Sequence, residues 1–148
     1  MDWVNKHLQI VPINTFIDPI FPVENAIITH AHADHAKPGH NNVLATKHTI
    51  EIMKIRYGEN CANNFQELSF NSPLNVNGVK VTFFPAGHIL GSAQVLLEYR
   101  KDKINFTGDF KITKDDTCEN FRPVTCDTLV TEATFGLPIF QHPDPEFE

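Results

Sequence analysis

The chain has 148 residues, 41% of them hydrophobic and 20% charged, values that fit one folded domain with a sizeable core and exclude a disordered chain. Its net charge of −6, with scattered basic residues, argues mildly against a nucleic-acid partner, because phosphate backbones normally call for clustered Lys and Arg. The absence of a signal-peptide pattern or membrane-length apolar run, and three cysteines without paired spacing, predict a soluble cytoplasmic protein with reduced thiols.

The first half of the chain predicts short strands followed by one helix. Strands are expected at residues 8–11, 16–18 and 25–29. The helix is expected from Thr46, as N-cap, to Tyr57, with Gly58 as its terminator. Together with the strands that follow, this pattern favours a layered α/β fold.

The second half predicts strands joined by turns. Asn77-Gly78 between two apolar runs is a strong hairpin signal. Residues 111–127 carry charges and Pro123 with little periodicity, which predicts a loop. The remaining expected strands are residues 81–84, 94–99, 103–107 and 128–131, with 94–99 paired to 103–106.

Four metal-ligand side chains lie within the run His30-Ala31-His32-Ala33-Asp34-His35. In an extended segment side chains two residues apart point the same way, so His30 and His32 are able to bind one ion. If the chain then turns into a helix, Asp34 and His35 are directed towards a second ion. Imidazole and carboxylate are the ligands of catalytic zinc, so this pattern favours a metal centre over a polar loop.

Three further candidate residues follow strands. His88 lies on a glycine-flanked turn after the strand at 81–84, Asp109 follows 103–107, and Glu132 follows 128–131. Each alone is typical of an ordinary loop or cap, but α/β enzymes build sites from strand ends at one sheet edge. Their common placement predicts one shared site.

These residues resemble the metallo-β-lactamase superfamily. His30, His32, Asp34 and His35 match its H-x-H-x-D-H signature, and His88 and Asp109 match its next two ligand motifs. Asp18, before the signature, matches an aspartate that usually supports the histidines from behind. The resemblance runs from about Phe16 to the end of the chain and implies an αββα sandwich, of which this chain carries the N-terminal portion.

Three motifs resemble the β-CASP nucleic-acid-processing branch of that superfamily. They are residues 86–93 (AGHILGSA), 106–110 (FTGDF) and 131–136 (TEATFG), with Glu132 as the acidic residue of the last. Residues 116–118, 121–124 and 134–138 look closest to bacterial DNA ligase-associated exonucleases, and the chain is also similar to mRNA 3′-end processing nucleases.

The resemblance implies a zinc-dependent phosphodiester hydrolase, an exonuclease of DNA repair or RNA processing that holds two Zn²⁺ ions. His30, His32 and His88 are expected to hold one ion, Asp34 and His35 the second, and Asp109 to bridge them. Asp34, Asp109 and Glu132 are the expected catalytic residues. Asp34 is expected to orient or deprotonate a water molecule, and Glu132 to support the site without ligating a metal ion. Gly87, Gly91 and Ser92 are expected to shape the wall beside His88. The expected partners are a DNA or RNA substrate, which zinc itself helps to attract, and an associated DNA ligase or helicase.

The departure from the family pattern is at the C-terminal side. Residues 1–148 are expected to be an incomplete metallo-β-lactamase domain, because the cap domain, two later histidine motifs and the returning half of the fold do not follow Glu132. His142 matches neither motif and is expected at the surface, and His7, His40 and His48 are expected to be ordinary surface or packing residues. The expected consequence is self-association through uncovered strand faces, which would include Phe83, Phe84, Val95, Leu97 and Phe106.

Two alternatives remain open. One is another metallo-β-lactamase-fold hydrolase, acting on a thioester, lactone or lactam. The other is a metal-binding fragment without turnover. The sequence does not separate DNA from RNA, exonuclease from endonuclease, or the polarity of cleavage.

Overall fold

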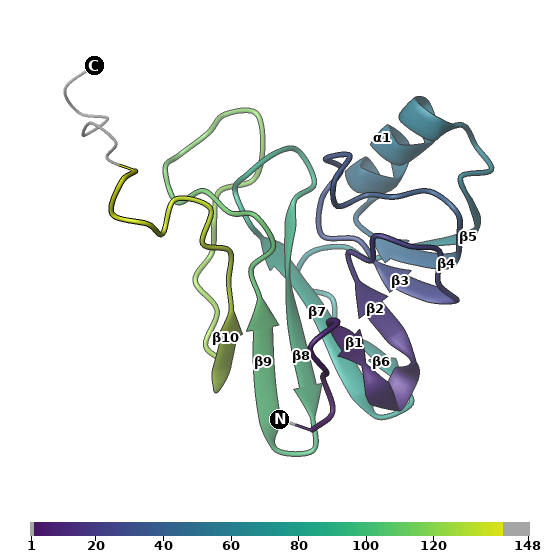
Figure 1. Ribbon diagram of the computed structural model, residues 1–148, viewed down its shortest axis with the longest axis horizontal. Coiled ribbons are helices and arrows are strands. Elements are labelled where there is room, and N and C mark those ends of the chain that lie inside the picture. The colour runs from purple at the N-terminus through teal and green to yellow at the C-terminus, as the bar shows by residue number, and fades with distance from the viewer. Residues whose placement is uncertain (1, 141–148) are drawn as a thin grey trace.

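The computed structural model describes residues 2–140, in which two β-sheets and one α-helix form three layers (Figure 1). One sheet has the order β1-β2-β3-β4-β5 and the other the order β10-β9-β8-β7-β6. The first sheet consists of β1 (Gln9–Ile10), β2 (Thr15–Ile17), β3 (Asn25–Ile27), β4 (His40–Ala45) and β5 (Ala62–Glu67). A 3-10 turn, η1 (Val11–Ile13), connects β1 to β2, and helix α1 (Lys47–Tyr57) lies between β4 and β5 in the chain. The second consists of β6 (Leu74–Val76), β7 (Val79–Pro85), β8 (Ala93–Tyr99), β9 (Asp102–Phe106) and β10 (Thr128–Val130).

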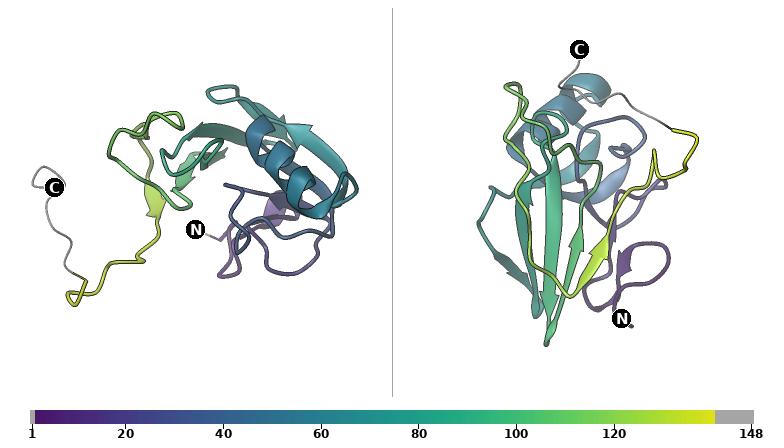
Figure 2. Two further views of the ribbon diagram at one scale, coloured as in Figure 1. Left: turned by 90° about the horizontal axis from the view of Figure 1, so that it is seen from above. Right: turned by 90° about the vertical axis from the view of Figure 1, so that its left-hand side faces the viewer.

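The two sheets differ in strand direction. Strands β2 to β5 are parallel to one another and β1 is antiparallel to β2. Strands β6 to β9 form an antiparallel meander, and β10 adds in parallel to β9. Helix α1 lies on the face of the first sheet that points away from the second (Figure 2). The expected α/β class, with its two facing sheets and one outer helix, is confirmed.

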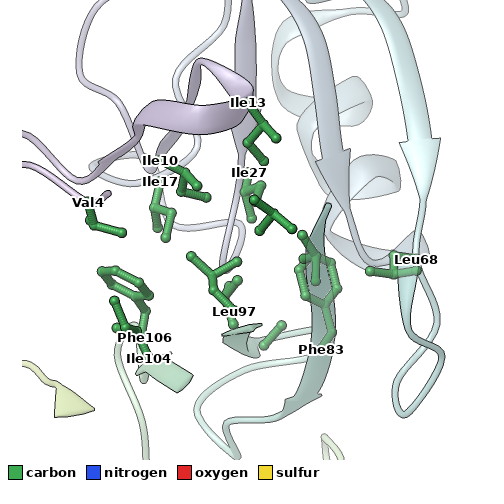
Figure 3. Close-up of a cluster of buried hydrophobic side chains, with 14 of the residues drawn as sticks. Val4, Ile10, Ile13, Ile17, Ile27, Leu68, Phe83, Leu97, Ile104 and Phe106 are labelled. Atoms are coloured by element: carbon green, nitrogen blue, oxygen red, sulfur yellow. The ribbon is translucent and has the colours of Figure 1, made fainter. Parts of the chain in front are cut away.

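The main core lies between the sheets. Ile17 and Ile27 of the first sheet point toward the second, which contributes Phe83, Leu97 and Phe106 (Figure 3). These side chains are at most 3% exposed, so the expectation that apolar faces of β7 to β9 are open to water is wrong. The reason is that residues 9–67 already supply the covering sheet. Of the residues expected to be uncovered, Phe84 alone is partly exposed, on the outer face of β7.

Apolar surface is exposed elsewhere, towards the C-terminal side of the described chain. Leu129, Phe135, Leu137 and Ile139 are each more than half exposed. Self-association of the isolated chain therefore stays a prediction, with its expected location moved to residues 129–140. His142 lies outside the described residues.

Helix α1 forms where the sequence predicted it. The Thr46 side chain accepts a hydrogen bond from the Thr49 N–H, and Gly58 ends the helix with a φ of 94°. Ile50 and Met53 pack onto the outer face of the first sheet, in a second apolar cluster with Val43 and Cys61. None of the helices in the described part of the chain is long and apolar enough to cross a membrane.

The predicted hairpin is also confirmed. Val76 and Val79 are paired, so Asn77 and Gly78 are the two turn residues, with φ values of 45° and 87°. Positive φ at both positions is the geometry that Asn-Gly favours in a two-residue hairpin.

Two expectations about the first sheet need correction. Strands β4 and β5 were not predicted, because their sequences HNNVLA and ANNFQE are too polar for the usual apolar alternation. Their asparagines form side-chain ladders instead: Asn64 donates to Asn42 and Asn42 to Asn25, at 2.9 Å each. No helix follows the His30–His35 run. The Ala36 N–H bonds to the His32 carbonyl at 2.8 Å, which closes a single turn.

Residues 111–122 run over the outer face of the second sheet, near the ends of β7 and β8. They contain no helix or strand, as expected for this loop. The Arg122 guanidinium lies over the Phe84 ring, 5.5 Å from its centroid. This loop joins Asp109 to β10, so it connects two of the turns that carry candidate site residues.

Candidate metal centre

Three turns bring four candidate ligands together at one end of the sandwich. His30 and His32 follow β3, His88 follows β7 and Asp109 follows β9. The Nδ1 atom of His32 lies 3.2 Å from Nε2 of His30 and 3.1 Å from Nε2 of His88. The Asp109 Oδ2 atom lies 3.8 Å from the Nε2 atoms of His30 and His88. Four donor atoms from residues up to 79 positions apart thus converge on one point.

Asp18 and Thr29 orient two of the histidines. The Thr29 hydroxyl donates to the Asp18 Oδ2 atom at 2.5 Å, so it receives a hydrogen bond from Nδ1 of His30 at 3.0 Å. His35 Nδ1 also bonds to Asp18 Oδ2, at 2.8 Å. Both rings then carry their proton on Nδ1, and their Nε2 lone pairs face the centre. Asp18 reaches this position with a φ of 44°, which aspartate tolerates better than most residues.

Burial favours the neutral, ligating form of His30. Its pKa is lowered to about 3, first by burial and then by the neighbouring imidazoles of His35, His88 and His32. The pKa of His88 is lowered for the same first reason. The pKa of His35 is raised, chiefly by its hydrogen bond to Asp18, with burial opposing. Neutral imidazole is the form that binds metal, so His30 and His88 are ready to ligate at neutral pH.

The donor spacing fits a transition-metal ion of zinc size. A tetrahedral zinc about 2.0–2.1 Å from each nitrogen places its ligand atoms about 3.3 Å apart. The two histidine nitrogen contacts of 3.1 and 3.2 Å are close to that edge length. The Asp109 Oδ2 atom, 3.8 Å from Nε2 of His30, lies slightly farther away than that edge length, and a small rotation of the side chain would bring it to the ion. Three imidazoles and one carboxylate suit zinc better than calcium or magnesium, which prefer all-oxygen sites.

A second group of donors adjoins the first. His35 Nε2 lies 3.5 Å from Asp109 Oδ1 and 3.7 Å from Asp34 Oδ2. Asp109 therefore faces both groups, one oxygen to each. The Asp34 side chain is 78% exposed, so the second group is far more open than the first. A cleft of about 320 Å³ runs beside it, lined by these carboxylates and by apolar residues including Ile20 and Val130.

Glu132 does not lie among the converging donors. Its Oε1 accepts the Phe110 N–H at 3.0 Å and its Oε2 accepts the Thr134 hydroxyl at 2.5 Å. Burial raises its pKa, but the hydrogen bonds from Thr134 and Phe110 outweigh this and leave the pKa below its ordinary value. Because Phe110 follows Asp109, the geometry allows Glu132 to support that ligand from behind.

Small residues let the His88 turn pack tightly. A Cβ on Gly87 would lie 2.4 Å from the Lys111 carbonyl oxygen, and one on Gly91 would lie 2.8 Å from the Thr46 hydroxyl. The Ser92 hydroxyl accepts hydrogen bonds from the backbone N–H groups of His88 and Ile89. These residues hold the turn itself, rather than lining an open wall.

Two contributors escaped the sequence reasoning. Thr29 was seen only as a strand end, although it links Asp18 to His30 and packs against Gly108, beside Asp109. Arg56, near the end of α1, donates from Nη1 to the Ala31 carbonyl, between the first two histidines. Neither has a local sequence signal, because the Thr29 hydroxyl bonds to the Asp18 carboxylate 11 residues away and Arg56 bonds to a backbone carbonyl 25 residues away.

Comparison with known proteins identifies the family. A profile described as "Beta-lactamase superfamily domain" matches residues 2–139. The chain therefore belongs to the β-lactamase superfamily. Its fold is similar to that of a protein of unknown function from Enterococcus faecalis V583, with a TM-score of 0.50, 20% identity, and coverage of 64% of this chain and 26% of that one.

Its curated relatives match the β-CASP nuclease branch that the motifs indicated. A "Probable DNA ligase" of Opitutus terrae is 30% identical over 137 residues, which are 92% of this chain and 13% of that protein. "Endoribonuclease ysh1" of Aspergillus fumigatus is 37% identical over 75 residues, 49% of this chain and 9% of that protein. "Cleavage and polyadenylation specificity factor subunit 3" of Dictyostelium discoideum is 35% identical over 78 residues, 51% of this chain and 10% of that protein. The chain thus spans only a small part of the relatives it matches.

Proposed function

We propose that this chain carries the metal-binding part of a zinc-dependent phosphodiester hydrolase, an exonuclease of the β-CASP type that acts on DNA or RNA. The observation that carries the proposal is the convergence of His30, His32, His88 and Asp109 at zinc-like spacing. Nuclease and ligase names among the relatives support nucleic acid as the substrate. The ligase relative, which aligns with most of this chain, supports a role in DNA repair and an association with a DNA ligase. Association with a helicase is the other part of this proposal.

In this proposal the two donor groups hold two ions. His30, His32 and His88 would hold one ion and Asp34 and His35 would contribute to the other, while Asp109, whose two oxygens face the two groups, would be shared between them. Bound zinc would supply Lewis-acid stabilisation of the charge that develops on a phosphoryl group.

The remaining steps belong to the protein's own residues. Asp34, which is exposed beside the cluster, would accept a proton from an attacking water in this proposal. Asp18 and Thr29 fix the ring orientations of His30 and His35. Glu132 fixes the backbone next to Asp109 through the Phe110 N–H. The cleft beside His35 gives a substrate access to this side of the centre.

The test measures metal content and turnover separately. Purified wild-type chain should contain between one and two zinc per chain by elemental analysis. A His30→Ala and His88→Ala double variant should lose most of it. His7→Ala, which removes an exposed histidine outside the cluster, is the matched control and should keep the wild-type content.

Turnover is then assayed on single-stranded DNA, single-stranded RNA and an ester panel. Zinc-dependent cleavage of a nucleic acid that is lost in the double variant supports the proposal. Folded wild-type protein without zinc would contradict it, and zinc-dependent cleavage of esters alone would favour another hydrolase of the superfamily.

A second candidate is a metal-binding fragment without turnover. The exposure of the second donor group favours it, because the Asp34 side chain is 78% exposed and would be open to water. Zinc binding by wild-type protein with no cleavage of any substrate in the panel would support this candidate instead.

A further inference from the structure

The side chain of Gln94, on β8, makes contacts that the metal centre described so far does not include. It is 1% exposed on the outer face of the second sheet. Its Nε2 atom donates to the Pro85 carbonyl at 2.9 Å and to the Arg122 carbonyl at 2.7 Å. Its Oε1 atom accepts from Asn105 Nδ2 at 3.0 Å. All three contacts are buried or partly buried, so the amide is fixed at both ends.

The two carbonyls belong to the segments that carry and cover the His88 turn. Pro85 ends β7, three residues before His88. Arg122 ends the segment that leaves Asp109 and returns to β7, and its own N–H bonds to the same Pro85 carbonyl at 3.2 Å. Gln94 therefore joins the base of the His88 turn to the far end of the segment that begins at Asp109.

The returning segment presses directly on the residue before His88. A Cβ on Gly87 would lie 2.7 Å from the Phe121 nitrogen and 2.4 Å from the Lys111 carbonyl oxygen. At the near end, the Lys111 N–H bonds to the Ala86 carbonyl at 3.0 Å. Because residues 111–122 form no helix or strand, contacts such as these determine where the segment lies.

We propose that Gln94 is a positioning residue for the metal centre: its amide fixes the returning segment against Pro85 and so holds His88 and Asp109 at the spacing that metal binding requires. This inference rests on the proposed metal-binding function. It predicts that loss of the two Nε2 hydrogen bonds weakens metal binding beyond any general loss of stability.

The experiment compares two substitutions of Gln94 with one of its neighbour. Gln94→Met and Gln94→Glu both keep the side-chain length and remove the donors to Pro85 and Arg122. Asn105→Leu is the matched control, since Asn105 is equally buried and its loss removes only the hydrogen bond to Oε1, leaving both Nε2 hydrogen bonds of Gln94 in place. Each metal-free protein is unfolded with urea, and its zinc affinity is measured by competition with a chromophoric chelator. The visible spectrum of bound Co²⁺ reports the ligand geometry.

We expect the Gln94 variants to bind zinc about 10–100-fold more weakly, the usual effect of losing a group that orients ligands, with an altered Co²⁺ spectrum. Asn105→Leu should lose comparable stability and keep the wild-type affinity and spectrum. Unchanged zinc affinity in a folded Gln94 variant overturns the inference. An equal loss of zinc affinity in Asn105→Leu also overturns it, as does failure of both Gln94 variants to fold. Wild-type protein that binds no zinc would instead overturn the proposed function itself.

Discussion

Gly87→Ala should destabilise the protein through a clash that no side-chain movement relieves. Gly87 has a φ of 70°, where a residue with a Cβ costs about 1–2 kcal/mol. The added methyl group would also meet two backbone atoms, the Lys111 oxygen at 2.4 Å and the Phe121 nitrogen at 2.7 Å. Forcing surplus atoms into a packed site costs about 1–3 kcal/mol. The expected loss is therefore about 2–5 kcal/mol, a large part of the ~5–15 kcal/mol of a typical domain.

Gly78→Ala separates the two contributions. Gly78 has a φ of 87°, but nothing lies within 4 Å of the Cβ that alanine would add. This variant should lose only the backbone contribution of about 1–2 kcal/mol. Unfolding free energies come from urea titrations of the metal-free proteins. Zinc affinity should fall in Gly87→Ala, because the next residue is His88, and should be unchanged in Gly78→Ala. Equal stability losses in the two variants would refute the argument that the segment at 111 and 121 encloses Gly87.

Asp109→Asn, which removes a carboxylate that faces both donor groups, should abolish nuclease turnover while the circular dichroism spectrum stays native; wild-type turnover would exclude a bridging role. Glu132→Gln should cost less, about 10–100-fold in activity or metal affinity, because Glu132 contacts Phe110 rather than the donors. Asp18→Asn weakens the acceptor of His35 Nδ1 and should lower the occupancy of the second ion before that of the first, as elemental analysis would show. The pKa of Glu98 is lowered, chiefly by its hydrogen bond to Lys80, while burial opposes the shift. Ionised Glu98 should therefore stabilise the folded protein above pH 4.5, its ordinary pKa, and this contribution should be lost as the pH falls through the lowered pKa of the folded state. Urea titrations should accordingly show Glu98→Gln costing less than about 1 kcal/mol at pH 7 and nothing at low pH.

Much of the fold could be read from local pattern. Helix α1 has its cap residues beside it in the sequence, and the Asn77-Gly78 hairpin needs only two residues with positive φ. Strands β7 to β9 were predictable because one face of each is apolar. By contrast, β4 and β5 are stabilised by side-chain amide ladders between strands, and a ladder exists only once its neighbours are in register. The apolar faces of β7 to β9 are covered by the first sheet, and the way in which the two sheets pack cannot be predicted from a local sequence pattern.

For the metal centre, the sequence by itself determined which residue types are present and at what spacing. The His30–His35 run places several ligands within one turn, so their proximity follows from chain connectivity alone. Only the tertiary structure decided which ring nitrogens face the centre. It also decided that Asp109 faces both donor groups and that Thr29, Arg56 and Gln94 support the turns. The physical reason is that Asp18 and Thr29, Arg56 and Ala31, and Gln94 and Arg122 are separated in the chain and come within hydrogen-bonding distance only in the folded structure.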